Sequence, residues 1–365
     1  MVKRILQVFG SLDLGGAETM IVNILRRLDT TQMVFDFIVS GSEEGYYEQQ
    51  IKGLSGEIYH IRKRSCSFIG HHLDFYRVVK ENGYKIIHFH EQNAFLMSMQ
   101  AVVARLAGAE TLIIHSHNSM DWRGKKFLLM HRAFRPLLCH SADVRLACSK
   151  EAARWLYGKV RRVEIIPLPV DCQAFLFQEE TRKRQRSLLG IDSEDVYLHV
   201  GRFNDVKNHE YLIEIFQQIV KIRAGSRLLL AGSGELQEQV RIQVKNCGLE
   251  KKVTFLGDIS DVNAKMMAAD AFLFPSKYEG FPTVLLEAQA TGLPSYISDR
   301  ITPDIIMTDL IAQLSINQKA ELWAKQIVQE RRKWRGMERK KYNGTIAKHY
   351  DISVVMEKFM KLYNA

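Results

Sequence analysis

Short apolar runs along the chain alternate with longer segments in which apolar residues recur at every third or fourth position. A short apolar run that ends in glycine or proline predicts a buried strand, whereas the longer period predicts an amphipathic helix. The runs that predict strands, with the turn residues that end them, are 3–10, 84–90, 111–117, 196–202, 227–235, 253–258 and 271–274. Strands that alternate with helices in this way predict an α/β fold with parallel sheets covered on both faces.

The alternation is interrupted once, and the interruption predicts two domains. The apolar run 163–170 is followed by the polar, highly charged segment 171–195, and Val196 restarts the pattern. A chain of 365 residues with 46% hydrophobic content is long enough for two α/β domains. We therefore predict a first domain over 1–170 and a second over 171–349.

Two glutamates that stand eight positions apart are the most informative feature of the second domain. They follow the predicted strand 271–274, and Pro282 or Thr283 can open the next helix, because proline suits a first turn that needs no N–H partner. Glu279 is then expected in the strand-to-helix loop, and Glu287 about one turn inside the helix.

The start of this predicted helix is a candidate anion site. The free amides of Phe281, Thr283 and Val284 would point out of the helix N-terminus. One carboxylate beside an anion site and one a turn away suit a ligand with both phosphate and hydroxyl groups. A sugar nucleotide is such a ligand.

The same segment resembles a known family. Pro275-Ser-Lys-Tyr-Glu-Gly-Phe-Pro-Thr-Val-Leu-Leu-Glu287 is similar to the E-x7-E signature of family 4 retaining glycosyltransferases, which have the GT-B fold. The resemblance implies that Glu279 faces the donor sugar and that Glu287 bonds the ribose hydroxyls. It also implies a donor-binding role for Gly280, Phe281, Pro282 and Thr283. The alternative is a solvated loop glutamate followed by a glutamate on an exposed helix face.

A second motif supplies two cations. Arg202 ends the strand 196–202, and Lys207 begins an amphipathic helix, which resembles the family's G-R-x4-K-[GN] motif, whose arginine and lysine hold the donor diphosphate. Arginine can form a forked pair with phosphate oxygens, and lysine adds a mobile point charge. Two such cations would stabilise the leaving diphosphate, so we expect no metal ion and no cofactor. Alternatively, both are ordinary surface cations.

Glycines follow two further strands of the second domain. Gly232 and Gly234 would let the backbone come close to a ligand, although any strand-to-helix turn can carry such glycines. Gly257 and Asp258 follow the next strand, and the resemblance implies that this loop lies beside the nucleobase.

In the first domain, Leu14-Gly-Gly-Ala-Glu18 predicts a glycine-rich turn into a helix. The resemblance extends to this G-G-A-E sequence, and Gly15 and Gly16 would permit close approach of the donor phosphate and the acceptor. The sequence is not the G-x-G-x-x-G dinucleotide fingerprint, which disfavours a dehydrogenase. A tight turn alone would also favour glycine.

Two predicted strands of the first domain end in histidines, at His88 and His90 and at His115 and His117. Open α/β sheets bind ligands at the carboxyl ends of their strands. The resemblance favours His117 as the contact to the transferred sugar. We expect His115 to point to the opposite side of the sheet or to be shifted by the loop, and the other two to be hydrogen-bonded fillers. A metal site is a disfavoured alternative, because the spacing is not typical of zinc.

The segment 122–140 is basic and strongly apolar, with cations interleaved among large apolar residues. Such a helix can lie in a membrane interface, or it can be an ordinary helix with one face in the core and a cationic face in water. Residues 1–170 carry 23 Lys and Arg against 16 Asp and Glu, and the rest carry 28 against 25. The positive excess therefore lies mainly in the half that would meet an anionic acceptor.

Composition excludes several classes of protein. No apolar run reaches the roughly 18 residues of a membrane span, and the N-terminus lacks the apolar core of a signal peptide. The five cysteines are scattered, which favours reduced thiols. A pI near 9.3 would suit nucleic acid, but no recognition motif accompanies it. We expect a cytoplasmic protein, with peripheral association at the inner membrane face as an option.

These observations together predict a retaining glycosyltransferase with two Rossmann-like domains facing each other across a cleft. The resemblance implies that the last helix, 350–365, packs back on the first domain. The donor would be a nucleoside diphosphate sugar, with uridine as the family's usual base, and the acceptor a lipid-linked glycan or oligosaccharide in surface polysaccharide synthesis. The alternatives are a sugar-nucleotide epimerase of the same fold and a catalytically silent partner subunit.

Overall fold

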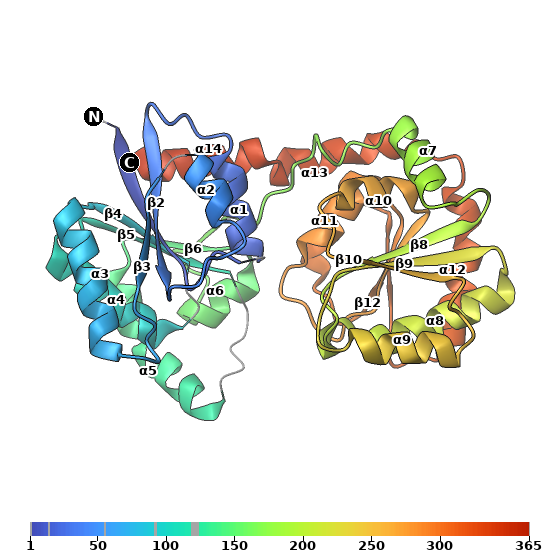
Figure 1. The fold of residues 1–365 in the computed structure, drawn as a ribbon, viewed down its shortest axis with the longest axis horizontal. Coiled ribbons are helices and arrows are strands. Elements are labelled where there is room, and N and C mark those ends of the chain that lie inside the picture. Colours follow the sequence, from blue (N-terminus) through green and yellow to red (C-terminus); the bar gives the residue numbers. More distant parts are fainter. Residues whose placement is uncertain (1, 14, 55, 91–92, 118–123, 365) are drawn as a thin grey trace. The chain divides into compact units, whose positions relative to one another are not determined.

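The computed structural model describes residues 2–13, 15–54, 56–90, 93–117 and 124–364. The chain divides into two compact units, which are described separately (Figure 1). Unit 1 contains residues Met1–Pro169 and Ile352–Ala365, and unit 2 contains Val170–Asp351. Each unit is a parallel α/β sandwich, so the predicted fold class is confirmed.

The described part of unit 1 forms a seven-stranded parallel sheet in the order β3-β2-β1-β4-β5-β6-β7. Its strands are β1 (Lys3–Val8), β2 (Met33–Ser40), β3 (Ile58–Ile61), β4 (Ile86–Phe89), β5 (Thr111–Ser116), β6 (Val144–Ala147) and β7 (Glu164–Ile165). Its helices are α1 (Gly16–Leu25), α2 (Glu48–Leu54), α3 (Phe68–Asn82), α4 (Ala94–Ala107), α5 (Lys125–Ser141), α6 (Lys150–Tyr157) and α14 (Ile352–Asn364).

The C-terminal helix α14 belongs to the core of unit 1. Val355, Phe359 and Tyr363 are fully or almost fully buried, and they share one hydrophobic cluster with the central strands. Their four-residue spacing places all three on one face of the helix. The last residues of the chain therefore help to complete the fold of its first domain.

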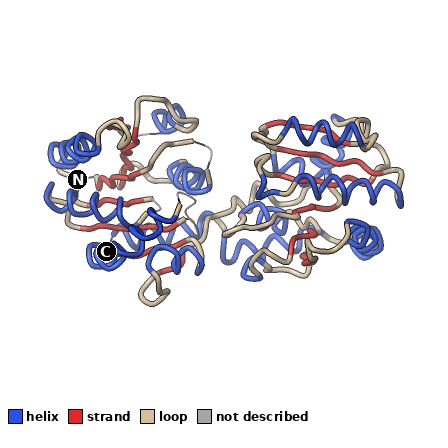
Figure 2. The backbone as a smooth tube through the Cα atoms, turned by 90° about the horizontal axis from the view of Figure 1, so that it is seen from below, coloured by secondary structure: helices blue, strands red, loops and turns tan. Residues whose placement is uncertain are grey.

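The described part of unit 2 forms a six-stranded parallel sheet in the order β10-β9-β8-β11-β12-β13. Its strands are β8 (Asp195–Val200), β9 (Ser226–Ala231), β10 (Val253–Gly257), β11 (Ala271–Phe274), β12 (Ser295–Ser298) and β13 (Ile311–Leu314). Its helices are α7 (Glu179–Leu188), α8 (His209–Ile222), α9 (Gln237–Asn246), α10 (Val262–Ala268), α11 (Thr283–Ala290), α12 (Ala320–Trp334) and α13 (Asn343–Tyr350), with short 3-10 turns at Asp205–Lys207, Pro303–Ile305 and Arg339–Tyr342. Figure 2 shows helices on both sides of these strands.

The two sheets have the same order of strands. In each sheet the order reverses between the first and fourth strands of the unit, β1 and β4 in unit 1 and β8 and β11 in unit 2. Ligands of open α/β sheets bind outside the carboxyl ends of the strands at such a switch point. The loops that leave these four strands are therefore where the candidate residues should be sought.

Candidate active site

The loop after β11 has the predicted local structure. β11 ends at Phe274, and α11 begins at Thr283, so Glu279 lies in the loop and Glu287 lies one turn inside the helix. Pro282 occupies the N-cap position, and no side chain in the described part of the chain caps this helix end. The first amides of α11 are thus available to an anion.

Lys207 and Glu279 form an ion pair. Lys207 Nζ donates to Glu279 Oε1 at 2.6 Å, and the side chains are only 18% and 13% exposed. The ammonium group also lies 4.8 Å from the centre of the Phe274 ring, a cation–π contact. The charges of Lys207, which is predicted to bind the donor phosphate, and of Glu279, which is predicted to face the donor sugar, therefore neutralise each other in this structure.

Two loops are tied together to place this pair. Asn204 Oδ1 accepts from the Lys207 amide, and Asn208 Nδ2 donates to the carbonyl of Pro275 at 3.1 Å. Asn208 is in the left-handed conformation, with φ 56°. This residue ends the 3-10 turn, so α8 begins at His209 and not at Lys207 as predicted.

Arg202 extends from the same loop and is largely free to bind an anion. Its side chain is 73% exposed, and its only ion-pair contact among the described residues is Glu235 at 3.6 Å. An exposed ion pair of this length contributes little to stability. A phosphate group can therefore replace Glu235 at low cost.

Packing against the loop after β8 by itself requires glycine at positions 232 and 234. Both have positive φ, and a Cβ there would lie 2.3 Å from the carbonyl oxygen of Gly201 and 2.5 Å from that of Phe203. The glycines are needed because the loop after β9 packs against the loop after β8. They shape the site from behind, through backbone packing.

Glu287 is the partly buried carboxyl group of the site. It has no hydrogen-bond partner among the residues that the structure describes, and burial raises its pKa to about 7. A carboxyl group in this state is easily ionised when a ligand supplies hydrogen-bond donors. Ribose hydroxyls are donors of that kind.

The predicted nucleobase loop is also organised internally. Gly257 has φ 69°, and its carbonyl accepts from the Gly232 amide at 2.8 Å. Asp258 Oδ2 accepts from Ser233 Oγ at 2.7 Å. The loops after β9 and β10 thus form one connected edge, and Asp258 keeps a carboxylate oxygen for a further partner.

The glycine turn of unit 1 opens α1 as predicted, and Leu14 lies outside the described residues. A Cβ at Gly16 would lie 2.9 Å from Leu168 Cδ1, and one at Gly15 would lie 2.2 Å from Glu18 Oε2. The Glu18 carboxyl group therefore lies against the first turn of its own helix, and burial raises its pKa. Sequence analysis did not identify this residue as part of the site.

The four histidines at the ends of β4 and β5 gather into one buried cluster. Ring centroids lie 4.1 Å apart for His88 and His90, 5.1 Å for His90 and His117, and 4.0 Å for His115 and His117. The expectation that His115 points away from His117 is wrong, because residues two apart on a strand face the same side. Burial lowers the pKa of all four rings, that of His117 to about 3.

Hydrogen bonds connect three of these rings to β1 and α14. His90 Nδ1 lies 2.8 Å from His117 Nε2, and His90 Nε2 lies 2.8 Å from Gln7 Oε1. Gln7 Nε2 donates to the Tyr363 hydroxyl at 3.2 Å, and that hydroxyl lies 2.7 Å from His88 Nδ1. Sequence analysis missed Gln7 and Tyr363. An uncharged polar residue inside the apolar first strand was the one signal that could have drawn attention to Gln7.

Comparison with known proteins agrees with this geometry. Residues 14–174 match the family described as Glycosyltransferase Family 4, and residues 181–354 match Glycosyl transferases group 1. A Bacillus subtilis (strain 168) protein named as glycosyltransferase EpsF is 32% identical over 341 residues, which cover 89% of this chain and 87% of that protein. The chain is a family 4 glycosyltransferase.

A second relative of the glycosyltransferase has a more specific name. The Escherichia coli UDP-Gal:alpha-D-GlcNAc-diphosphoundecaprenol alpha-1,3-galactosyltransferase is 27% identical over 62% of this chain and 61% of its own length. Among solved structures, Anabaena HepE in complex with UDP-glucose has a TM-score of 0.80 at 17% identity and covers 99% of both chains. WaaG, a glycosyltransferase of lipopolysaccharide biosynthesis, has a TM-score of 0.71 at 15% identity, with 99% of both chains covered. These likenesses show that the fold is GT-B.

Three histidines of the buried cluster of the glycosyltransferase lie close enough together to be considered as metal ligands. His88, His90 and His115 each offer a ring nitrogen within 4.8 Å of the others. However, both nitrogens of His90 already have hydrogen-bond partners, and the rings of His88 and His115 are stacked at 3°. A metal ion bound by this cluster would therefore have to displace Gln7 or His117 from His90.

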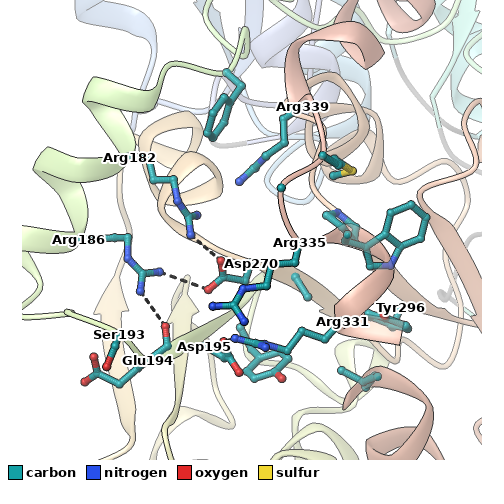
Figure 3. Close-up of a pocket in the computed structure, with 18 of the residues that line it drawn as sticks. Arg182, Arg186, Ser193, Glu194, Asp195, Asp270, Tyr296, Arg331, Arg335 and Arg339 are labelled. Atoms are coloured by element: carbon teal, nitrogen blue, oxygen red, sulfur yellow. Dashed lines mark hydrogen bonds and ion pairs between the residues drawn. The ribbon is translucent and has the colours of Figure 1, made fainter. Parts of the chain in front are cut away.

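Unit 2 has a cavity of about 340 Å³ whose lining includes none of the predicted donor residues. Arg182, Arg186 and Asp270 belong to this lining (Figure 3). The cavity is lined by residues at the amino ends of β8 and β11, whereas Arg202 and Glu279 follow the carboxyl ends. Arg182 and Arg186 bind Asp270 there, and both also donate to carbonyls at the end of α10. Arg182 and Arg186 therefore have a structural role as caps of that helix.

The basic segment predicted over 122–140 forms helix α5, and residues 122 and 123 lie outside the described part. Leu129 and Leu137 are 70% and 37% exposed, and Lys125, Lys126 and Arg132 are exposed on the same helix. Among the described residues, no helix has the length and apolar character needed to span a membrane. The exposed face of α5 thus combines cations with leucines.

Proposed function

We propose that this glycosyltransferase moves a sugar, with retention of its anomeric configuration, from a UDP-sugar to a hydroxyl of a lipid-linked glycan in polysaccharide synthesis. One observation carries the proposal. Lys207, Glu279 and the uncapped start of α11 come together at the switch point of unit 2, with Glu287 one turn further on. This set combines a cation and free amides for phosphate with carboxylates for hydroxyl groups.

Uridine as the base is supported by the relatives. HepE binds UDP-glucose, and the Escherichia coli relative is named for a UDP-Gal donor. In the proposal, the diphosphate displaces Glu279 from Lys207 and takes Arg202 from Glu235. Glu279 then turns to the sugar, and Glu287 accepts from the ribose hydroxyls.

The proposed chemistry needs no protein nucleophile. The bond between the sugar C1 and the phosphate oxygen breaks while the acceptor oxygen bonds to C1 on the same face. The acceptor proton passes to the departing phosphate oxygen, so atoms and charge balance. Arg202, Lys207 and the α11 amides stabilise the charge that develops on the diphosphate, and we propose that no metal ion is required.

A lipid-linked acceptor is supported by two observations. The Escherichia coli relative is named for a diphosphoundecaprenol acceptor. The exposed cations and leucines of α5 match the anionic headgroups and apolar interior of a membrane surface. We therefore propose that unit 1 binds the acceptor and contacts the membrane through α5.

The donor site is tested by calorimetry with UDP, UDP-glucose, UDP-galactose and UDP-N-acetylglucosamine, in the presence of EDTA. We expect one UDP-sugar to bind, with at least a tenfold loss in Arg202→Ala, because a charge-assisted bond contributes about 1.5–3 kcal/mol. Arg241→Ala is the matched control, since Arg241 is an exposed arginine of unit 2 on α9. Absence of binding by folded protein would overturn the proposal.

The stereochemistry is tested with the donor that binds. Transfer to a synthetic undecaprenyl-diphosphate sugar should give a product whose anomeric proton shows the configuration of the donor. An inverted product would exclude the same-face mechanism. Hydrolysis or epimerisation of the donor without transfer would instead support an epimerase.

A further inference from the structure

Four hydrogen bonds in the interior of unit 1 form a single chain that runs from His88 to His117. The order of groups is His88, Tyr363, Gln7, His90 and His117. We infer that Gln7, acting through His90, holds His117 in the tautomer protonated on Nε2, so that Nδ1 is a bare acceptor for a hydroxyl of the sugar substrate. The identity of the ligand rests on the proposed function, whereas the tautomer does not.

The Gln7 amide determines which groups donate and which accept along this chain of hydrogen bonds. Its oxygen can only accept, so His90 must carry a proton on the Nε2 that faces it at 2.8 Å. Its nitrogen donates to the Tyr363 hydroxyl, whose own proton is then directed to His88 Nδ1. One side chain of β1 therefore orients partners on both sides.

Because the rings of His90 and His117 are neutral, the donor and acceptor roles at His90 also decide those at His117. Both rings are buried among other histidines, and burial lowers the pKa of His90 far enough to keep it neutral at physiological pH. A neutral ring has one proton, so His90 Nδ1 is bare and accepts from His117 Nε2 at 2.8 Å. His117 is neutral as well, and its Nδ1 therefore carries no proton.

The Nδ1 atom of His117 is the open end of this chain. It is covered, and it has no hydrogen-bond partner among the described residues. A buried polar atom without a partner is unfavourable, and a ligand hydroxyl that donates to it would recover part of that cost. A ligand group that can only accept, such as a carbonyl or fluorine, would gain nothing there.

Gln7 is thus a positioning residue, and its amide nitrogen donates to the Tyr363 hydroxyl. If the amide were turned over, every donor in the chain would become an acceptor, and His117 would present an N–H on Nδ1. The same three rings, at the same distances, would then select for ligand acceptors. The preference of the site depends on an amide that lies two hydrogen bonds along the chain from His117.

The test is nitrogen NMR of the full-length protein with 15N-labelled histidine. The ring signals of His117 are assigned by their loss in His117→Gln. We expect Nε2 to have the shift of a protonated nitrogen and Nδ1 that of a bare nitrogen. The reverse pattern, or an averaged pattern that shows two tautomers, would overturn the inference, and this test needs only the wild-type protein.

A variant then tests the role of Gln7. In Gln7→Glu the carboxylate favours an imidazolium at His90, which donates from both nitrogens, so the proton of His117 should move to Nδ1 and its two signals should interchange. Gln100→Glu is the matched control, because Gln100 is also buried in unit 1 and lies 3.2 Å from His71 Nε2. The His117 signals should be unchanged in this control, and unchanged signals in folded Gln7→Glu would remove Gln7 from the role.

UDP binding separates this inference from the proposed function. Calorimetric affinity for UDP should be the same in wild-type protein and Gln7→Glu, because the side chains proposed to bind the diphosphate and the ribose, Arg202, Lys207 and Glu287, all lie in unit 2. If no variant binds UDP, the proposed function fails while the tautomer result stands. If UDP binds but the His117 tautomer is wrong, the inference fails and the proposed function is untouched.

Discussion

The two sheets of this glycosyltransferase have the same strand order, yet the groups at their switch points differ in charge. In unit 2 the site contains an arginine, a lysine and two carboxyl groups. In unit 1 the corresponding ends of β4 and β5 carry four buried imidazoles, and burial holds their pKa low enough to keep them neutral. One architecture thus supports two different kinds of polar site.

The difference teaches how each site can recognise a ligand. Charges recognise a diphosphate strongly and with little dependence on direction, since cation–phosphate attraction acts from many angles. Neutral imidazoles discriminate by the direction of each hydrogen bond, which suits hydroxyl groups. Changes to unit 2 should therefore alter affinity most, whereas changes to unit 1 should alter stability and selectivity.

The largest effect is expected for Lys207→Ala. It removes a cation and leaves Glu279 partly buried without its partner, so UDP-sugar affinity should fall by about 100-fold or more, or ~2.7 kcal/mol. Calorimetry is the measurement. Lys277→Ala is the control, because Lys277 forms a similar pair with Asp205 but is 44% exposed. Equal affinity for Lys207→Ala and wild type would contradict the assigned phosphate role.

The next effect concerns the acid stability of unit 1. The pKa of His115 is lowered by burial, so the unfolded chain takes up a proton first, and stability is lost as pH falls below about 6.5. Both ring nitrogens of His115 lack partners among the described residues. His115→Leu should therefore be about 1 kcal/mol more stable at pH 7 and gain about 2 kcal/mol more at pH 5.

Denaturant unfolding at pH 7 and pH 5 measures this difference. His140→Leu is the matched control, since His140 is an exposed histidine of the same unit and should show neither gain. A His115→Leu protein that lost stability at both pH values would show that the ring has a packing role that outweighs its unpaired nitrogens.

A smaller effect is expected for the pH dependence of donor binding. The pKa of Glu287 is raised to about 7, and ribose hydroxyls bind best to the ionised carboxylate. The ionised fraction rises with pH, so UDP-sugar affinity should increase by about tenfold between pH 6 and pH 8. In Glu287→Gln this slope should disappear, and affinity at pH 8 should fall by about tenfold. An unchanged slope in Glu287→Gln would assign the titration to another group.

The smallest effect is expected at the exposed face of α5. Leu129→Ser should weaken binding to vesicles of anionic phospholipid by about threefold, which corresponds to part of one leucine side chain leaving the apolar interface. Co-sedimentation is the measurement. Leu188→Ser is the control, because Leu188 is 74% exposed but lies on α7 of unit 2. Equal losses for both variants would argue against a specific role for α5.

Much of the fold was predictable because local pattern decides it. The strand 271–274 agrees in both ends with β11, and the helix predicted to start at Pro282 or Thr283 starts at Thr283. Continuous apolar runs indicate buried parallel strands, so the positions of the strands along the sequence can be predicted without knowledge of tertiary contacts. The predicted break after 170 and the division of the structure at Val170 both lie immediately before the charged segment 171–195.

In unit 2 the residue types of the candidate site were predictable, but their contacts were not. Lys207 and Glu279 belong to spaced motifs, but their contact joins residues 72 positions apart, and no pattern indicates that they pair. The positions of Gly232 and Gly234 show the same limit, since positive φ is compatible with either a ligand or a neighbouring loop. Sequence showed that the backbone comes close to something there, and packing decided what that is.

The amino-acid sequence by itself determined the alternation of strands and helices, the position of the charged segment that begins the second domain, and the residue types that a sugar nucleotide requires. Only the tertiary structure decided that four histidines from two strands share one buried volume, and that Gln7 meets a tyrosine 356 positions further along the chain. The physical reason is that periodicity reports which face a residue occupies, whereas the direction of a hydrogen bond depends on every partner in the buried chain.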